Sequence, residues 1–352
     1  MRARAERLVA LLEGRQLDCL LVTNLVNVRY LTGFTGTNGA CIVSREDRVF
    51  LTDFRYVQQA KEQVPDFDRV EAGRELLGDV AARLRGRAGF DDAHMSVKAH
   101  RRLAERVGEG VELVPAGGLV ERLRAVKDER ELRAIRAAAE IADAAYHELR
   151  SRGLGGRTER EVALSLARFM EDRGADGVSF PAIVAAGAHG ALPHAEPRGV
   201  EIPRGTLVVV DMGARVDGYC SDCTRTLATG PLDDRPLEAY EVVRRAQETA
   251  LESVRAGAVC REVDGLARGM VEAGLGLTFE HGLGHGVGLE VHEEPRLART
   301  ADGSLESGNL VTVEPGVYVP GEFGIRIEDL VAVTDEGHER LTGFPKELVT
   351  LD

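Results

Sequence analysis

Two acidic residues end apolar runs within one stretch of the chain, Val208–Thr226. A strand-like run ends at Asp211, the turn-prone Asp217-Gly218 follows, and Asp222 comes next, which predicts a β-hairpin carrying two carboxylates. A four-residue loop Arg215–Gly218 would place the acids directly opposite each other, whereas a two-residue loop would make them diagonal neighbours on the same face. Like charges so placed are destabilising unless a cation lies between them. A metal ion is the simplest candidate.

A second stretch, Val313–Asp329, repeats this arrangement with Glu314 and Glu328 on apolar strands. Their residue numbers have an even sum, so direct pairing needs a turn of odd length or a bulge, and the sequence leaves this open. Between the hairpins lies Phe279–Pro295, in which glycines that permit close backbone approach surround three histidines. These histidines are His281, His285 and His292.

The chain is long enough for two domains, since 352 residues exceed the roughly 150 that one domain usually takes. Its 43% hydrophobic and 29% charged residues are typical of a soluble globular protein. The net charge of −13 argues against a nucleic-acid partner.

No apolar run reaches the roughly 18 residues of a membrane span, and the N-terminal stretch lacks the apolar core of a signal peptide, so we expect no membrane association. Five scattered cysteines favour reduced thiols in a cytoplasm. Cys220 and Cys223 form a C-x-x-C without a second pair, and we interpret them as small residues flanking Asp222.

Helical and strand patterns alternate from the start to about Val114, which predicts a small α/β domain. We expect helices at Arg2–Glu13 and from Tyr56, and strands at Cys19–Val22, Ala40–Ser44, Val49–Thr52, near Val70, Arg87–Phe90 and Val111–Val114. The punctuated stretch Val114–Gly118 predicts the boundary between domains of residues 1–118 and 119–352.

The second domain opens with two helices that have capping-box patterns, Asp128 with Glu131 and Thr158 with Glu161. The second of these helices is expected to continue through Met170. After the first hairpin we expect two more helices and then a strand pair, at Leu237–Ala256 ended by Gly257, around Val263–Val271 ended by Gly274, and from Leu310. Two helices followed by two strands thus occur twice, which predicts a pseudo-symmetric domain.

These stretches resemble the pita-bread metallopeptidases, the fold of methionine aminopeptidase, creatinase and the Xaa-Pro peptidases. The resemblance runs from about Lys127 to the C-terminus and rests on D-x-G…G-Y-x-S-D-x-T-R-T, H-x-x-G-H-G-x-G-L…H-E-x-P, V-x-V-E-P-G and G-x-R-I-E-D. Asn27–Gly39 and Leu51–Tyr56 are similar to the smaller domain of Xaa-Pro peptidases, which methionine aminopeptidases lack. The expected fold class is α/β plus α+β, a small creatinase-type N-terminal α/β domain followed by a pseudo-symmetric pita-bread catalytic domain.

The resemblance also implies roles for individual residues. It implies a dinuclear metal centre, with Asp222 and Glu328 as bridging carboxylates, held by Asp211, Asp222, His285, Glu314 and Glu328. An oxygen-rich set with one imidazole suits manganese or cobalt, and zinc or iron less selectively.

The residues implied at the substrate are His194, His281 and His292, with Arg326 as a nearby cation. Within this group His292 would stabilise an oxyanion and His194 would share in catalysis, while Glu314 would accept or pass a proton. The remaining histidines fit no such pattern and are expected at the surface: His94, His100, His147, His189 and His338.

The implied function is cleavage of the bond between an N-terminal residue and proline, by a cytoplasmic homodimer. We favour a dipeptidase (prolidase) acting on proline-containing dipeptides, and the alternative is an aminopeptidase P acting on longer peptides. A metal-free creatinase-like C–N hydrolase and a non-catalytic interaction protein are rivals that would have lost ligands, whereas all five are present here.

A dipeptidase must recognise the free carboxylate beyond proline, which a charge-assisted contact can do. Arg55, where a predicted strand gives way to a helix, is a candidate that could reach a cleft in its own subunit or in a partner's. The alternative is that Arg55 pairs locally with Asp53 or caps the interface between the domains, and Arg326 is a competing reader of the carboxylate.

Overall fold

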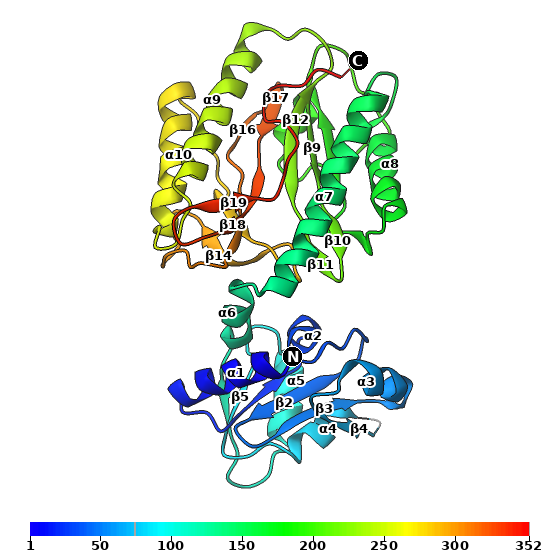
Figure 1. Cartoon of the computed structure of the whole chain (residues 1–352), viewed down its shortest axis with the longest axis vertical. Coiled ribbons are helices and arrows are strands. Elements are labelled where there is room, and N and C mark those ends of the chain that lie inside the picture. Colours follow the sequence, from blue (N-terminus) through cyan, green and yellow to red (C-terminus); the bar gives the residue numbers. More distant parts are fainter. Residues whose placement is uncertain (74, 352) are drawn as a thin grey trace. The chain divides into compact units, whose positions relative to one another are not determined.

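The computed structural model describes residues 1–73 and 75–351 (Figure 1). It divides into two compact units, Met1–Arg124 and Ala125–Asp352. The sequence predicted a boundary after Gly118; helix α6 (Leu119–Ala125) starts directly after that point and groups almost entirely with the first unit.

The first unit is a mixed six-stranded sheet covered by helices. Its strands are β1 (Cys19–Val22), β2 (Ala40–Ser44), β3 (Arg48–Thr52), β4 (Asp68–Glu71), β5 (Arg87–Phe90) and β6 (Glu112–Pro115). Its other helices are α1 (Arg2–Gly14), α2 (Leu25–Thr32), η1 (Phe54–Tyr56), α3 (Val57–Gln63), α4 (Leu76–Ala81) and α5 (Val97–Ala104). The strand order is β4-β3-β2-β1-β5-β6, with β1 antiparallel to β2 and parallel to β5. The predicted small α/β domain is confirmed.

The second unit contains the two expected pairs of helices, α7 (Glu129–Arg152) with α8 (Glu159–Asp172), and α9 (Asp234–Glu252) with α10 (Cys260–Leu275). Both predicted capping boxes are present, at Asp128 and at Thr158. In Figure 1 the strands of this unit lie between α7 and α8 on one side and α9 and α10 on the other. Each pair buries an apolar face against the strands, and this forms two separate cores.

The strands of the second unit form four small sheets. The first half contributes β7 (Gly177–Val178), β8 (Ile183–Ala186), β9 (Leu207–Met212), β10 (Ala214–Val216), β11 (Tyr219–Cys220) and β12 (Cys223–Ala228), with η2 (Gly187–Ala191) after β8. The second half contributes β13 (Gly284–Gly286), β14 (Glu293–Leu297), β15 (Leu310–Val313), β16 (Gly316–Val319), β17 (Phe323–Arg326), β18 (Asp329–Val333) and β19 (His338–Arg340). The sheet orders are β11-β10-β7, β12-β9-β8, β14-β13-β15-β18-β19 and β16-β17. The predicted pseudo-symmetric domain therefore has helices and then strands in each half.

Three predicted helix ends were wrong, and one of them is the end of α9, which lies at Glu252 and not at the predicted Ala256. Helix α9 starts at Asp234, before the predicted Leu237, because Pro236 is tolerated in a first turn where its missing N–H has no helical partner. Helix α10 continues through Gly274 and ends at Leu275, where Gly276, with a φ of 64°, provides the left-handed cap. A Cβ at Gly274 would lie 2.8 Å from the side chain of Val242, so this glycine permits close packing of α10 on α9.

Among residues 1–73 and 75–351, no helix combines the length and the apolar character that crossing a bilayer requires.

Candidate metal centre

The first hairpin adopts the shorter of the two loops considered from the sequence. Strands β10 and β11 leave only Asp217-Gly218 between them, and both turn residues have positive φ, at 53° and 77°. In the same register β9 and β12 pair Asp211 with Thr224. Asp222 therefore comes opposite Gly213 and is a diagonal neighbour of Asp211. A Cβ at Gly213 would lie 1.9 Å from a backbone oxygen, so glycine is required for this close approach.

The second hairpin has a turn of odd length. All pairs between β15 and β18, and between β16 and β17, follow one register that leaves three turn residues, 320–322. This register places Glu314 directly opposite Glu328. Pro315 interrupts the ladder between the two strand pairs because it has no N–H to donate. The odd turn that the sequence left open is therefore how the two glutamates meet.

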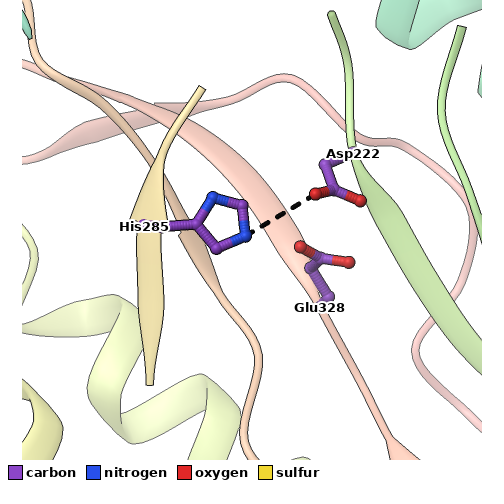
Figure 2. A group of neighbouring side chains, drawn as sticks. All are labelled: Asp222, His285 and Glu328. Atoms are coloured by element: carbon purple, nitrogen blue, oxygen red, sulfur yellow. Dashed lines mark ion pairs between the residues drawn. The ribbon is translucent and has the colours of Figure 1, made fainter. Parts of the chain in front are cut away.

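His285 lies on β13, which pairs with β15 and so brings the glycine-rich segment beside the second hairpin. Its Nδ1 lies 3.0 Å from the carbonyl oxygen of Gly286, and Nδ1 must carry the proton because a carbonyl only accepts. When the imidazole is neutral, Nε2 presents a lone pair, 3.2 Å from Oε1 of Glu314 and 3.7 Å from Oδ2 of Asp222. Figure 2 shows His285, Asp222 and Glu328 converging from separate segments, and ligand atoms of these three lie within 4.8 Å of one another.

We call Asp211, Asp222, His285, Glu314 and Glu328 the cluster. Its four carboxylates repel one another because they share a poorly solvated space. Burial and the neighbouring acids raise the pKa of Glu328 and of Asp222 well above the ordinary value. Burial also raises the pKa of Asp211, although the Arg326 guanidinium opposes it. At Glu314 burial acts in the same direction, but a protonated His285, which donates a hydrogen bond to this carboxylate, and the charges of His281 and Arg326 outweigh burial and lower the pKa to about 2.

Two oxygens of the cluster are buried without a hydrogen-bond donor from the part of the chain that the structure describes. They are Oδ1 of Asp211 and Oε1 of Glu328. Donorless oxygens that face an imidazole lone pair fit divalent cations, which supply the missing positive charge. Two divalent ions and four carboxylates carry equal and opposite charge. The five predicted ligands thus lie in one cluster, in which ligand atoms of Asp222, His285 and Glu328 are close enough together to hold a metal ion.

Removal of divalent metal is expected to lower the melting temperature of the protein. Metal at about 100 times its Kd stabilises the native state by about 2.7 kcal/mol, and chelation leaves the carboxylates without counter-ions. The measurement is a thermal melt after dialysis against EDTA, repeated after manganese or cobalt is added back. Glu328→Gln should respond much less to added metal. If the melting temperature of the wild type changed neither on chelation nor on re-addition of metal, the cluster would not be a metal site.

Arg326 lies on β17 with 4% of its surface exposed, and most of its donors are engaged. Its Nη2 donates to Oδ2 of Asp211 at 2.6 Å and its Nε to Oγ1 of Thr224 at 3.1 Å. Its Nη1 donates to the hydroxyl of Tyr318 at 2.9 Å and to the carbonyl of Pro193 at 3.3 Å. Arg326 thus orients a ligand acid and has little capacity left to read a substrate carboxylate.

Tyr318 is a site residue that sequence analysis missed. Nδ1 of His281 lies 2.7 Å from the carbonyl of Gly282, so a neutral His281 accepts at Nε2, where the Tyr318 hydroxyl donates at 3.0 Å. Both nitrogens of His281 are therefore engaged, and burial lowers the pKa of this histidine. Tyr318 stands four residues after Glu314, and the period-2 alternation of a strand could have placed both on one face.

A cavity of about 810 Å³ opens beside the cluster, and the predicted histidines lie along it. His292 packs its ring edge-on against His285, with 4.4 Å between centroids. Burial, together with the charges of His285 and Arg296, lowers the pKa of His292. His194 is exposed and lines the cavity from the segment between β8 and β9. The structure therefore brings three predicted histidines to the wall of one cavity, which is lined by Asp211, Asp222, His194, His281, His285, His292, Glu314 and Arg326 among others.

Two expectations outside the cluster had different outcomes. Arg55, in the first unit, donates to both carboxylate oxygens of Asp53, at 3.0 and 2.8 Å, which is the local pairing weighed as its alternative. His189 is not a surface residue as predicted, because its side chain is 8% exposed and its Nδ1 lies 3.0 Å from Oε2 of Glu159. The five cysteines are free and buried, as expected of reduced thiols.

The geometry agrees with comparisons to known proteins. Residues 133–335 match metallopeptidase family M24, and residues 4–126 match the creatinase/prolidase N-terminal domain. An Xaa-Pro dipeptidase from Bacillus anthracis is 40% identical, with a TM-score of 0.96 and 99% of both chains covered. An X-Pro aminopeptidase from Thermotoga maritima is 34% identical, with a TM-score of 0.89 and 99% of this chain and 100% of that chain covered.

A curated Xaa-Pro dipeptidase from Pyrococcus furiosus is 34% identical over 99% of this chain and 100% of its own length. A fold of this kind, with a carboxylate and histidine cluster under a cavity, defines a metal-dependent peptidase. The chain belongs to metallopeptidase family M24. The resemblance seen in the sequence is confirmed, including its creatinase-type N-terminal domain.

Proposed function

We propose that this chain is a dinuclear-metal Xaa-Pro dipeptidase. The observation that carries the proposal is the convergence of four carboxylates on two hairpins with His285 on β13, beside a cavity of about 810 Å³. Similarity over nearly the whole chain to proteins named Xaa-Pro dipeptidase supports the same conclusion. The X-Pro aminopeptidase among the similar structures keeps aminopeptidase P as the second candidate.

The proposed ligands are Asp211, Asp222, His285, Glu314 and Glu328. Bound there, the ions would supply a nucleophilic water near neutral pH and polarise the scissile carbonyl. Glu314, a proposed ligand carboxylate beside the ions, would accept or pass the proton. His292 donates a hydrogen bond to the developing oxyanion, and His194 assists from the cavity wall.

Recognition of proline needs a pocket that does not depend on an amide hydrogen, because the Xaa–Pro bond has none. Part of the cavity is apolar, and a pyrrolidine ring can pack against this wall, formed by Phe180, Pro181, Ile183 and Val291. This supports a substrate whose second residue is proline.

Recognition of a dipeptide also needs a cation for the free carboxylate. Arg326 is committed to Asp211 and Tyr318. Arg296 on β14 is an exposed cation that lines the cavity and pairs across the strands with His285, so it is the better placed reader. Arg55 remains the alternative proposed from the sequence.

Arg296→Ala is expected to lower kcat/KM for Ala-Pro roughly 10–100-fold, because a charge-assisted contact contributes about 1.5–3 kcal/mol. Ala-Pro-Ala, whose carboxylate lies one residue further on, should change little. Arg55→Ala, assayed in parallel, should leave the ratio between the two substrates unchanged. A selective loss of Ala-Pro hydrolysis in Arg55→Ala alone would assign the role to Arg55 and reject Arg296.

We further propose that the protein is loaded with manganese or cobalt and that it acts as a homodimer in the cytoplasm. The decisive experiment is hydrolysis of Ala-Pro beside Ala-Pro-Ala after supplementation with manganese or cobalt. Metal content of the purified protein distinguishes the rivals, since a creatinase-like hydrolase or a non-catalytic protein would hold no stoichiometric metal. Failure to cleave either peptide in the metal-loaded state would reject the proposal.

A further inference from the structure

The segment that carries His194 is an irregular connection between β8 and β9. We call residues 186–198 the His194 segment. It contains one 3-10 turn, η2, and then runs along the cavity, which it lines with Pro193, His194, Ala195, Glu196 and Pro197. A segment with so little regular structure depends on side-chain contacts for its conformation.

Both ends of the His194 segment bind one carboxylate, that of Glu159. At the start, the backbone N–H of Ala186 donates to its Oε1 at 3.0 Å. At the end, Arg198 donates to it from the backbone N–H at 2.9 Å, from Nε at 3.0 Å and from Nη2 at 3.0 Å. Between these ends, Nδ1 of His189 lies 3.1 and 3.0 Å from its two oxygens. Glu159 therefore closes the segment into a loop.

Glu159 suits this task because it is buried and ionised. Its side chain is 1% exposed and lies in the first turn of α8, where a negative charge is favoured by the helix dipole. Burial raises its pKa, but hydrogen bonds from Arg198, Ala186 and His189 outweigh burial and hold the pKa below the usual value. Two backbone N–H groups of the same turn, at Glu159 and Arg160, donate to carbonyls of Val200 and Arg198 at 3.3 and 3.0 Å.

The middle of the His194 segment packs against the second hairpin. A Cβ at Gly324 on β17 would lie 1.8 Å from the carbonyl oxygen of Gly190, so the two backbones touch. Arg326 on the same strand donates to the carbonyl of Pro193 at 3.3 Å, directly before His194. The segment is thus held in its middle by the strand that orients Asp211 and at both ends by Glu159.

We propose that Glu159 is a positioning residue for substrate binding, which holds His194 at the cavity wall by binding both ends of its segment. The inference rests on the proposed function, because it takes His194 to contact substrate. Glu159 itself lies outside the cavity lining and touches no reacting atom.

The first test is amide hydrogen exchange, followed by mass spectrometry, on Glu159→Gln. An amide cannot accept from all of these donors, so exchange should accelerate in peptides covering residues 186–200 and stay unchanged in β9 and β12. Glu161→Gln is the matched control, because Glu161 lies in the same helical turn and its carboxylate accepts only within the cap at Thr158. Unchanged exchange in the His194 segment of Glu159→Gln would overturn the proposal.

The second test is a double-mutant cycle between Glu159→Gln and His194→Ala, assayed on Ala-Pro. Alone, Glu159→Gln should lower kcat/KM about 10–100-fold, mainly through KM, with metal content unchanged. In the His194→Ala background the further loss should be much smaller, because there is no imidazole left to position. Equal losses in both backgrounds would mean that Glu159 acts through general stability and would overturn the proposal.

Should Glu159→Gln fail to fold, Arg198→Ala replaces it, since the Arg198 side chain is 46% exposed and supplies two of the contacts. Arg198→Ala should also accelerate amide exchange in the His194 segment and should also be coupled to His194→Ala, but both effects should be smaller. An inactive wild-type protein would reject the proposed peptidase function. By contrast, an active wild type in which His194→Ala changes nothing would reject only the positioning of His194 by Glu159.

Discussion

Asp222→Ala is expected to abolish hydrolysis of Ala-Pro and to reduce the bound metal. Asp222 is buried 3.7 Å from Nε2 of His285, and its charge is proposed to offset both ions at once. Without this carboxylate the proposed site would keep too little negative charge and would offer one ligand fewer to each ion. The measurements are metal content after extensive dialysis and kcat/KM with metal in excess.

Asp217→Asn is the matched control for this variant. Asp217 lies in the turn of the same hairpin at a φ of 53°, a conformation that asparagine adopts readily, and it is exposed and not among the proposed ligands. It should keep full metal content and turnover. If Asp222→Ala did the same, the assignment of the ligands would be wrong.

His292→Ala is expected to lower kcat about 10²–10³-fold while the metal content stays unchanged. This is the usual cost of losing one donor to an oxyanion. His292 lines the cavity with its ring against His285 but outside the group of three convergent ligand side chains. Steady-state kinetics on Ala-Pro and metal analysis of the same preparation test both halves of the expectation.

His94→Ala, which alters an exposed histidine of the first unit, controls for loss of any histidine. Loss of metal from His292→Ala would instead make His292 a ligand. A kcat within about threefold of wild type would remove it from catalysis, because one oxyanion donor contributes far more than that.

Much of the fold and of the cluster could be predicted because strand pairing follows simple rules. The turn Asp217-Gly218 accepts positive φ at both positions, so one of only two registers had to hold. The even sum of Glu314 and Glu328 likewise restricted the second hairpin to an odd turn or a bulge. The sequence did not decide between the two loop lengths of the first hairpin, or between an odd turn and a bulge in the second. That choice depends on packing around the turns.

The contacts that hold the His194 segment could not be predicted from the sequence. Glu159 and Glu161 both look like first-turn acids that favour a helix N-terminus, yet one is buried under the His194 segment and the other is in the exposed cap. His189 was misjudged for the same reason, since its partner Glu159 is 30 residues away. Burial of a polar residue depends on which distant donors the fold brings to it.

The three-residue turn at 320–322 also limits how the length of this chain can change. If the same sequence closed through a turn of two or four residues, the pairing of the second hairpin would shift by one position, unless a bulge absorbed the change. Ile327 or Asp329 would then stand opposite Glu314, and Glu328 would lose its partner. One inserted residue therefore keeps Glu314 opposite Glu328 only where the turn itself takes it up, whereas a turn that stays at three residues accommodates insertions and deletions in steps of two.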